Sequence, residues 1–363
     1  MSLVWVFFFM ILAQQCTTPS NTPGNCSNLY RCTVLYDIYQ NPDSTTAQQI
    51  YLSDSYNDNC GHGMVCCPIE TRPISTPAPV TTTAPVTTTV IDTLLPRDCG
   101  TEILGPRIWD GKNTRRLDFP WLVLIEHTHF DGEKFLDCGG SLINNLYVVT
   151  AAHCLGTQSH KLTAVRLGEW NTATDPDCDD DGQCSAPVQY IRVVEQIRHE
   201  NYNRYSNNLE NDIGLLRLER PITFSNWIKP ICLPISDETI NGNVDREPYV
   251  VSGWGITQAG ALSIIKQKAE IGGVSINKCN RSYQKLGIIL TTNHLCAGGE
   301  GIDACNGDSG GPLMAMHRNN STTYYFLAGI ISFGTKTCGL QGWPGVYTRV
   351  DKYVDWIRTK IRP

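Results

Sequence analysis

The chain has 363 residues, 41% of them hydrophobic, and a formal net charge of −6. This length provides for one large domain and a smaller one, and the acidic balance argues against nucleic acid as a partner. Sixteen cysteines, an even number, are typical of a disulfide-bonded protein in an oxidising compartment. Zinc binding is the competing interpretation, but no Cys-x-x-Cys pair occurs, and the adjacent Cys66 and Cys67 suit separate disulfides better.

The N-terminal residues predict export. Leu3 to Ala13 form an apolar run that is too short for a comfortable membrane span. We therefore interpret residues 1–15 as a signal peptide cleaved between Ala13 and Cys16, although no basic residue precedes the run. No other stretch is apolar enough to cross a bilayer. The expectation is a secreted protein without a membrane partner.

Residues 16–67 predict a small domain held together by disulfides. About fifty residues rich in Asn, Asp, Ser and Tyr cannot bury much apolar surface, and three crosslinks would replace the missing core. The six cysteines of this segment allow 15 pairings. They are Cys16, Cys26, Cys32, Cys60, Cys66 and Cys67. Such a domain either docks a partner or is a stabilised unit without one.

Residues 68–98 differ sharply in composition from their neighbours. Prolines and threonines dominate, as in the repeat from Pro77 to Thr89, with few charges and no amphipathic period. This composition predicts an extended linker, open to O-glycosylation, and not a folded element.

Residues 99–363 predict an all-β domain, because short apolar or alternating runs are separated by turn residues, as in barrels or sandwiches. The runs are Trp121–Ile125, Tyr147–Thr150, Tyr190–Val194, Ile213–Leu218, Tyr249–Val251 and Phe326–Ser332. Only the end differs. Apolar residues from Tyr353 to Ile361 recur at helical spacing and predict a terminal amphipathic helix.

A serine lies between an acidic residue and two glycines in the segment from Asp303 to Pro312. A serine hydroxyl becomes a nucleophile when a base takes its proton and backbone N–H groups stabilise the resulting oxyanion. Gly-x-Ser-x-Gly alone is a weak signal, for which a glycine-rich turn is the better interpretation. The full string from Gly307 to Pro312 around Ser309 is much more specific.

Two further motifs offer a base and an acid. His153 follows an apolar run and precedes a cysteine, and Asp212 stands at the start of a buried run. Taken alone, His153 would be interpreted as a surface or core histidine and Asp212 as a turn residue or strand cap. Together the order His153, Asp212, Ser309 is that of the chymotrypsin triad, and three motifs in this order argue against coincidence.

On these motifs, residues 99–363 resemble the trypsin-like serine proteases of the chymotrypsin family, and the whole chain resembles the arthropod clip-domain proteases. The resemblance implies an all-β fold, a chymotrypsin-like double β-barrel with a C-terminal helix, preceded by a clip domain at residues 16–67. It also implies that His153 takes the proton of Ser309, that Asp212 orients the imidazolium, and that the N–H groups of Gly307 and Ser309 form the oxyanion hole.

The same resemblance implies the specificity. Asp303 occupies the family position at the base of the primary pocket, where a buried carboxylate is costly unless a cation arrives. The substrate should therefore supply Arg or Lys, with Arg preferred for its paired hydrogen bonds. Gly334 and Gly345 stand at the pocket walls, and Ser332 and Phe333 would line the substrate. The family more often has Trp where Phe333 stands.

An activation site is implied between Arg107 and Ile108. Residues 99–107 would end the light chain and residues 108–363 would form the protease domain. The freed ammonium of Ile108 would pair with Asp308 and order the oxyanion hole. Trp109-Asp110 departs from the usual residues of the family, so two nearby basic sites stay as alternatives. They are Arg97 and Arg115.

The resemblance also implies the disulfides. The expected pairs are Cys16–Cys66, Cys26–Cys60, Cys32–Cys67, Cys99–Cys232, Cys138–Cys154, Cys279–Cys296 and Cys305–Cys338, with Cys178–Cys184 as an extra local bond. This last bond closes an acidic loop in which the family binds calcium. The side chains of Glu169 and Asp177, with the carbonyls of Asn171 and Thr174, are the candidate Ca²⁺ ligands. A solvated acidic loop is an equally weighted interpretation.

Three sequons, at Asn25, at Asn280 and at the adjacent Asn319 and Asn320, are candidates for glycosylation. The function implied by the resemblance is a secreted zymogen of an innate-immune cascade in haemolymph, which cleaves prophenoloxidase, the precursor of the Toll ligand Spätzle, or a clip-domain protease or homologue. An upstream trypsin-like protease and a serpin inhibitor are the other expected partners. The alternatives are a non-catalytic clip-domain homologue acting as a cofactor, and a digestive trypsin.

Overall fold

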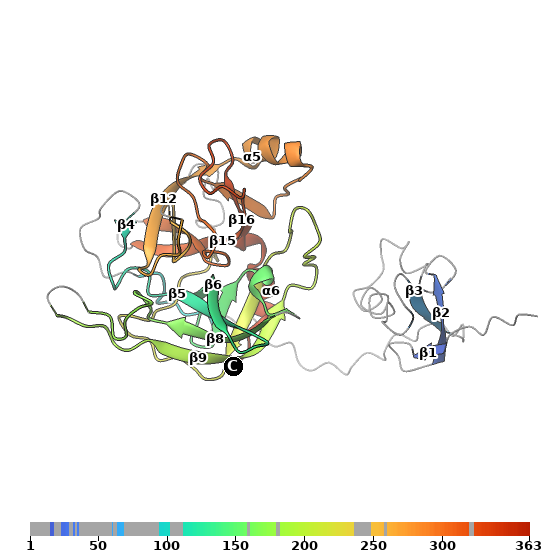
Figure 1. The fold of residues 1–363 in the computed structure, drawn as a ribbon, viewed down its shortest axis with the longest axis horizontal. Coiled ribbons are helices and arrows are strands. Elements are labelled where there is room, and N and C mark those ends of the chain that lie inside the picture. The colour runs from blue at the N-terminus through green and yellow to red at the C-terminus, as the bar shows by residue number, and fades with distance from the viewer. Residues whose placement is uncertain are drawn as a thin grey trace, which may run out of the picture. The chain divides into compact units, whose positions relative to one another are not determined.

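The structure is a computed structural model that describes residues 15–17, 23–28, 32, 35, 60, 64–68, 94–101, 112–157, 160–178, 182–235, 248–257, 260–318 and 323–363. It divides into two units, Met1–Pro85 and Val86–Pro363 (Figure 1). The predicted signal peptide cleavage, most of the linker and the junction between Arg107 and Ile108 lie outside the described residues. No helix within the described residues is long and apolar enough to span a membrane.

The N-terminal unit contains a three-stranded antiparallel sheet in the order β1-β2-β3. Its strands are β1 (Gln15–Thr17), β2 (Pro23–Asn28) and β3 (Met64–Pro68). Two disulfides, Cys26–Cys60 and Cys32–Cys67, join the sheet to the segments that flank it. Cys66 is buried and disulfide-bonded, whereas the side chain of its expected partner, Cys16, is not described. Crosslinks therefore take the place of a large apolar core here.

The second unit begins with a closed barrel in the strand order β10-β7-β6-β5-β8-β9. Its strands are β5 (Leu122–His129), β6 (Lys134–Leu142), β7 (Tyr147–Thr150), β8 (His160–Leu167), β9 (Gln189–Arg198) and β10 (Gly214–Leu218). The apolar runs predicted as strands at Tyr147–Thr150 and Ile213–Leu218 form β7 and β10, which pair with Gly214 opposite Thr150. This pairing positions His153, which follows β7, and Asp212, which precedes β10.

A second barrel follows in the order β11-β14-β15-β16-β13-β12 and closes through pairing of β11 with β12. Its strands are β11 (Pro248–Gly253), β12 (Gln267–Val274), β13 (His294–Ala297), β14 (Pro312–Arg318), β15 (Thr323–Phe333) and β16 (Gly345–Arg349), and the short β4 (Lys112–Asn113) pairs with β12. Figure 1 draws the first barrel mainly in green and the second in orange and red. The all-β prediction of two six-stranded barrels is confirmed.

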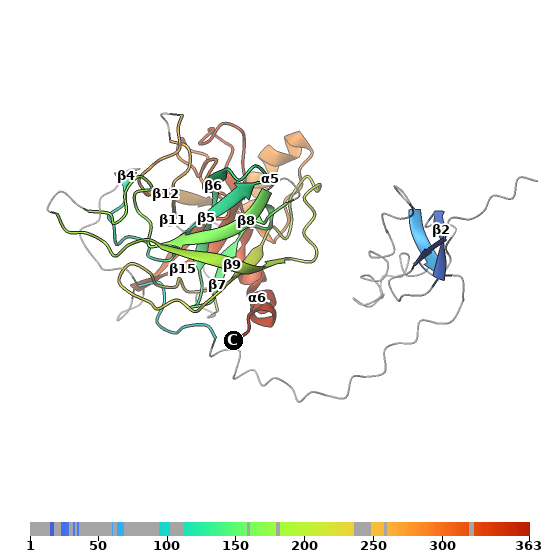
Figure 2. The same ribbon diagram turned by 60° about the horizontal axis from the view of Figure 1, so that its bottom comes forward.

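Within its described residues the unit also contains the α-helices α5 and α6. Helix α6 (Val354–Lys360) buries Val354 and Ile357, the residues whose spacing predicted it, and it packs against the core of the first barrel (Figure 2). Helix α5 (Ile276–Tyr283) was not predicted, because its exposed face is polar and only Cys279 and Tyr283 are buried. Three short 3₁₀ turns also occur, η3 (Ala152–Cys154), η4 (Gln284–Leu286) and η5 (Val350–Lys352).

Five disulfides crosslink this unit. They are Cys99–Cys232, Cys138–Cys154, Cys178–Cys184, Cys279–Cys296 and Cys305–Cys338. The bond from Cys99 fastens the segment 94–101 to the barrels. Gly100 adds two backbone hydrogen bonds, each 2.8 Å long. Its N–H donates to the carbonyl of Pro230, and its carbonyl accepts from the N–H of Tyr325. The chain before residue 102 is therefore anchored to the barrels independently of the residues that follow it.

Candidate active site

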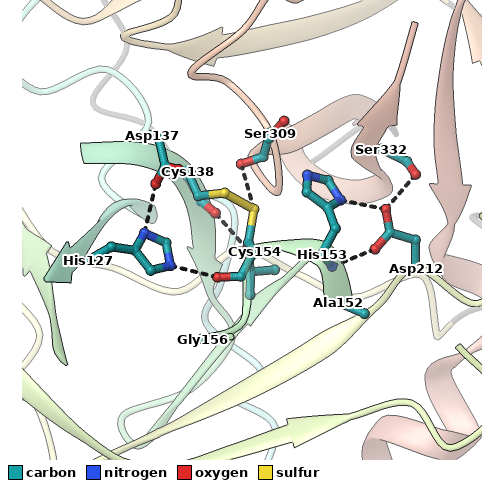
Figure 3. The surroundings of a disulfide bond; sticks show 12 residues. His127, Asp137, Cys138, Ala152, His153, Cys154, Gly156, Asp212, Ser309 and Ser332 are labelled. Carbon is teal, nitrogen blue, oxygen red and sulfur yellow. Dashed lines mark hydrogen bonds and ion pairs between the residues drawn. A yellow bond between two sulfur atoms is a disulfide. The ribbon is translucent and has the colours of Figure 1, made fainter. Parts of the chain in front are cut away.

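The base and the acid of the site are brought together by the pairing of β7 with β10. His153 lies in η3, directly after β7, and Asp212 lies two residues before β10. The His153 Nδ1 atom is 2.7 Å from Asp212 Oδ2, and the backbone N–H of His153 donates to Asp212 Oδ1 at 2.9 Å (Figure 3). Two contacts to one carboxylate fix both the position of the loop and the orientation of the ring.

Asp212 is fully buried, yet its hydrogen-bonding capacity is met. Ser332 Oγ donates to its Oδ2 atom at 2.5 Å, and Thr348 Oγ1 donates to its backbone oxygen at 2.7 Å. Burial alone would raise the pKa of Asp212, but the charge and hydrogen bonds of His153 and the Ser332 bond hold this pKa below the usual value. Burial likewise opposes the charged form of His153, and Asp212 outweighs it and raises the pKa of His153. The pair is thus built to stabilise an imidazolium.

The loop before β14 presents Ser309 to this pair. Gly310 has φ +76°, and a Cβ atom there would lie 2.2 Å from Thr150 Oγ1, so only glycine allows the loop to approach β7. The N–H of Gly139 donates to the carbonyl of Ser309 at 2.7 Å, which docks the loop on the first barrel. Among the described residues the Ser309 hydroxyl has no hydrogen-bond partner, and no bond joins it to His153 in Figure 3. Contacts of this kind often tighten only when substrate binds.

A cavity of about 440 Å³ opens beside Ser309 and is lined by Asp303, Ser332, Gly334 and Gly345. The Oδ1 atom of Asp303 accepts hydrogen bonds from the N–H of Ala304 at 2.9 Å and from Tyr347 Oη at 3.1 Å. Burial nevertheless raises the pKa of Asp303 to about 6. No cation within the described residues forms an ion pair with this carboxylate. The cavity therefore suits a cationic side chain that comes from outside.

The two glycines in the walls of this cavity differ in what an added side chain would meet. A Cβ atom at Gly345 would lie 2.8 Å from Asp303 Oδ1 and would displace the carboxylate. A Cβ atom at Gly334 would meet no atom within 4 Å, because that position faces open space in the cavity. A side chain at either position would therefore narrow the entrance or disturb the base.

A family model described as Trypsin matches residues 108–357, and a model described as Regulatory CLIP domain of proteinases matches residues 16–67. The chain belongs to the trypsin family of serine proteases. It is a clip-domain serine protease, and proteases of this kind are secreted, extracellular proteins.

Two curated relatives and one solved structure extend over almost the whole clip-domain protease. Serine protease ea of Drosophila melanogaster is 40% identical, over 96% of this chain and 91% of its own length. Phenoloxidase-activating factor 1 of Holotrichia diomphalia is 38% identical, over 99% and 98%. The crystal structure of the Drosophila Grass clip serine protease of the Toll pathway is 32% identical, covers 95% of this chain and 96% of that chain, and superposes with a TM-score of 0.66.

The residue before Ser309 lies next to a second and larger cavity of the protease, of about 840 Å³. Asp308 Oδ1 accepts from the N–H of Gly255 at 2.7 Å, and its Oδ2 accepts from the N–H of Cys305 at 3.0 Å. A Cβ atom at Gly255 would lie 2.3 Å from Asp308 Oδ2, so glycine is needed for this contact. Burial raises the pKa of Asp308 although both N–H donors lower it. Like Asp303, it is an acid that lacks a cationic partner within the described residues.

The backbone on either side of Asp308 would provide the oxyanion hole. Gly307 has φ +97°, a left-handed conformation that glycine adopts without strain. The N–H of Gly307 and that of Ser309 were predicted to bind the oxyanion, and neither donates to a backbone acceptor among the described residues. Both donors are therefore available to a substrate oxygen.

Two of the predicted calcium ligands in the acidic loop, Glu169 and Asp177, are buried acids, and Arg166 lies 3.7 Å from the Oε2 atom of Glu169. Asp177 Oδ2 accepts from the N–H groups of Trp170 and Asn171, each at 3.1 Å, and its Oδ1 accepts from Thr174 Oγ1 at 2.7 Å. Glu169 is buried, and its Oε1 atom has no hydrogen-bond partner. Burial and the nearby charge of Asp177 raise the pKa of Glu169 to about 7. A buried carboxylate oxygen without a donor, beside a second acid, fits a hard divalent cation.

The sequence analysis missed Tyr347, whose hydroxyl contacts the acid at the base of the pocket. Its signal was present, because Tyr347 lies two residues after Gly345 on β16 and alternate residues of a strand share a face. It also assigned Ser332 only to substrate binding, whereas its hydroxyl donates to Asp212.

The three predicted glycosylation sites differ in what the structure shows of them. Asn25 lies in β2. The side chain of Asn280, in α5, exchanges two hydrogen bonds with the backbone of Leu290, and a glycan there would take one of the two hydrogens of its Nδ2 atom. The third site, Asn320, lies outside the described residues, as does the neighbouring Asn319. Glycosylation of Asn320 therefore stays a prediction from the sequence.

Proposed function

We propose that the chain is a zymogen that, once cleaved between Arg107 and Ile108, hydrolyses protein substrates after arginine, and less well after lysine. The observation that carries this proposal is the unpaired Asp303 carboxylate at the base of the cavity beside Ser309. An arginine guanidinium would meet this carboxylate with two parallel hydrogen bonds and would remove the cost of its burial.

In the proposed mechanism, His153 Nε2 takes the proton of Ser309 while the serine oxygen bonds to the substrate carbonyl carbon. The carbonyl electron pair moves to its oxygen, which accepts hydrogen bonds from the N–H groups of Gly307 and Ser309. The imidazolium, held by Asp212, then gives its proton to the amide nitrogen as the C–N bond breaks. Water attacks the resulting ester by the same two proton transfers, which frees the carboxylate product and the serine.

Activation is proposed to depend on Asp308. Cleavage before Ile108 creates an ammonium group, and the cavity beside Asp308 has space for the new N-terminal residues. An ammonium at this acid would neutralise a buried charge and would draw Asp308 away from the N–H groups of Gly255 and Cys305. The Cys99–Cys232 bond would keep the clip domain attached after cleavage.

The biological role that we propose is a step in an arthropod immune cascade in haemolymph, with prophenoloxidase as the substrate. The similarity to Phenoloxidase-activating factor 1 supports this choice. The second candidate is processing of the Toll-ligand precursor Spätzle, supported by the similarity to a protease of the Toll pathway. Because the junction follows Arg107, its activator would itself be trypsin-like, and a serpin would end the activity.

Calcium is proposed as a structural ligand of the acidic loop. The carboxylates of Glu169 and Asp177 and the carbonyls of Asn171 and Thr174 would hold it. A bound Ca²⁺ would supply positive charge to the Glu169 oxygen that lacks a donor.

The test uses the full chain after cleavage at Arg107. We expect a fluorophosphonate to label Ser309 and arginyl peptides to be hydrolysed, with Ser309→Ala losing at least about 10⁴-fold in kcat and keeping its thermal stability. Ser225→Ala, which changes an exposed serine, is the matched control. Sequencing of new N-termini in candidate precursors then separates the two substrates. An unlabelled protein would favour the non-catalytic cofactor.

A further inference from the structure

A second histidine–carboxylate pair lies on the other side of the Cys138–Cys154 disulfide from the catalytic pair. His127 Nδ1 is 2.7 Å from Asp137 Oδ1, and His127 Nε2 is 2.8 Å from the carbonyl oxygen of Cys154 (Figure 3). The imidazole is buried, with 1% of its side chain exposed, whereas 49% of the Asp137 side chain is exposed. The catalytic mechanism proposed above does not use this pair.

The backbone is irregular next to His127. β5 shifts register against β6 between Ile125 and Glu126, and against β8 between Glu126 and His127. The strand is buried on both faces from Leu122 to His127, so these shifts change which neighbours Glu126 and His127 meet. A bulge re-aims side chains in this way and is common next to active sites.

Both partners of His127 are acceptors, and this determines how many protons the ring carries in this geometry. A backbone carbonyl can only accept, and so can an ionised carboxylate. Burial works against ionised Asp137, but the hydrogen bond and charge of His127 outweigh it and hold the pKa of Asp137 below the usual value. Both ring nitrogens must therefore donate, which requires the imidazolium form. A neutral ring would leave one buried acceptor facing a lone pair.

Other titratable groups around the ring do not supply a different partner for its nitrogens. His127 stacks on Phe135 of β6 at 5.4 Å and meets the edge of His160 of β8 at 4.9 Å between ring centroids. His129 stacks on the outer part of the same Phe135. Lys134 pairs with Glu126, and Arg204 acts on His160 only through its charge. Asp137 is the one carboxylate bonded to the His127 ring among the described residues.

The contact with Cys154 reaches both catalytic residues. Cys154 directly follows His153 in η3, so its carbonyl fixes the turn that carries the catalytic imidazole. The Sγ atom of Cys154 lies 3.4 Å from the carbonyl oxygen of Ser309. Asp137 also contributes to the raised pKa of His153 through its charge. A change at His127 is therefore transmitted to the catalytic base through one residue.

We propose that His127 is a positioning residue of the protease, whose doubly protonated ring, held by Asp137, donates to the Cys154 carbonyl and thereby fixes His153 for proton transfer. This inference rests on the proposed catalytic role of His153. Loss of either hydrogen bond of the ring would loosen this turn. The turn is thereby held by a group that takes no part in the proposed proton transfers.

The experiment compares the cleaved full chain with three variants between pH 6 and pH 9.5. The readouts are the labelling rate of Ser309 by a fluorophosphonate, which carries no arginine, and kcat and KM for an arginyl peptide. His127→Phe keeps the stacking and loses both donors, so we expect kcat to fall about tenfold with KM within about twofold. His129→Phe makes the same change at an exposed ring of the same cluster, and we expect no change.

Asp137→Asn is the decisive variant. The Asn amide can donate to Nδ1, so a neutral His127 ring satisfies both neighbours by donating only from Nε2. We expect a labelling rate within about threefold of the original protein near neutral pH, because the two hydrogen bonds of the ring are kept, and an acid limb shifted to lower pH because His153 loses a neighbouring charge.

Two results would overturn the inference: labelling of His127→Phe within twofold of the original protein at every pH, or labelling of Asp137→Asn that falls tenfold or more below that of the original protein near neutral pH. If thermal unfolding shows that His127→Phe does not fold, the inference is tested by Asp137→Asn alone. This variant should fold, because the Asp137 side chain is half exposed. If Ser309 is labelled in the original protein and at the same rate in His127→Phe, only this inference is contradicted. An original protein that never labels contradicts the proposed function.

Discussion

The acids in the two halves of the active site have pKa values shifted in opposite directions. In the half supplied by the first barrel, Asp212 is bonded by His153 and Ser332, and its pKa lies below the usual value. In the half supplied by the second barrel, the donors to Asp303 and Asp308 among the described residues are all neutral, and burial raises both pKa values. The catalytic base is therefore complete within the protein. The acids around the nucleophile lack their cations, which substrate and activation would bring.

Among changes to these acids, the largest effect should come from Asp308→Asn. Removing one partner of a buried ion pair costs about 3–5 kcal/mol, and at the upper end this corresponds to about 4 × 10³-fold. Because we propose that this acid orders the oxyanion hole, we expect both the fluorophosphonate labelling rate and arginyl peptide hydrolysis of the cleaved protein to fall. Asp355→Asn, at an exposed side chain, is the matched control. Full labelling of the Asp308 variant would remove Asp308 from the activation step.

Asp303→Asn should separate substrate recognition from the chemistry. We expect kcat/KM for arginyl peptides to fall about 10²-fold, the lower end for a buried pair, because Asn can still accept from Ala304 and Tyr347. The labelling rate with an uncharged fluorophosphonate should change by less than about threefold. Equal losses in both assays would mean that Asp303 supports the fold of the site and not the substrate cation.

The smallest effect is expected in the acidic loop. The pKa of Glu169 is raised to about 7 from 4.5, so the folded protein binds this proton more tightly than the unfolded chain. Stability without metal should therefore fall as pH rises from about 4.5 to 7. At pH 8 a hundredfold excess of Ca²⁺ over its Kd should raise Tm by about 5–10 °C, and at pH 5.5 much less.

Glu169→Gln tests the same loop. It should remove both the pH slope and the calcium effect, while Glu133→Gln, at an exposed residue, should preserve them. A calcium shift that survives in Glu169→Gln would place the ion elsewhere.

Sequence analysis found the parts of the site that are local in the chain. The apolar run at Tyr147–Thr150 is β7 without change, and His153 follows it directly. The helix at the end was predicted because Val354 and Ile357 share one face. These features depend on neighbouring residues, so a single sequence reveals them.

Features that depend on pairing between distant strands were not predictable. The predicted strand Trp121–Ile125 continues to His129 past two shifts in register, one against β6 and one against β8, and it buries the polar Glu126 and His127. Asn211, just before Asp212, adopts φ +63°, a conformation that depends on its side-chain contacts with the carbonyl of Asn201 and the hydroxyl of Tyr353. Neither the bulge nor this turn leaves a pattern in the local residues.

Proton release on binding of benzamidine, measured by calorimetry in buffers of different ionisation enthalpy, tests the contrast between the two halves most directly. With a pKa of about 6, Asp303 is half protonated at pH 6 and ionised at pH 8. An amidinium that pairs with it should release about half a proton at pH 6 and almost none at pH 8. The same small release at both pH values would mean that this acid is already ionised without its cation, which would contradict the account.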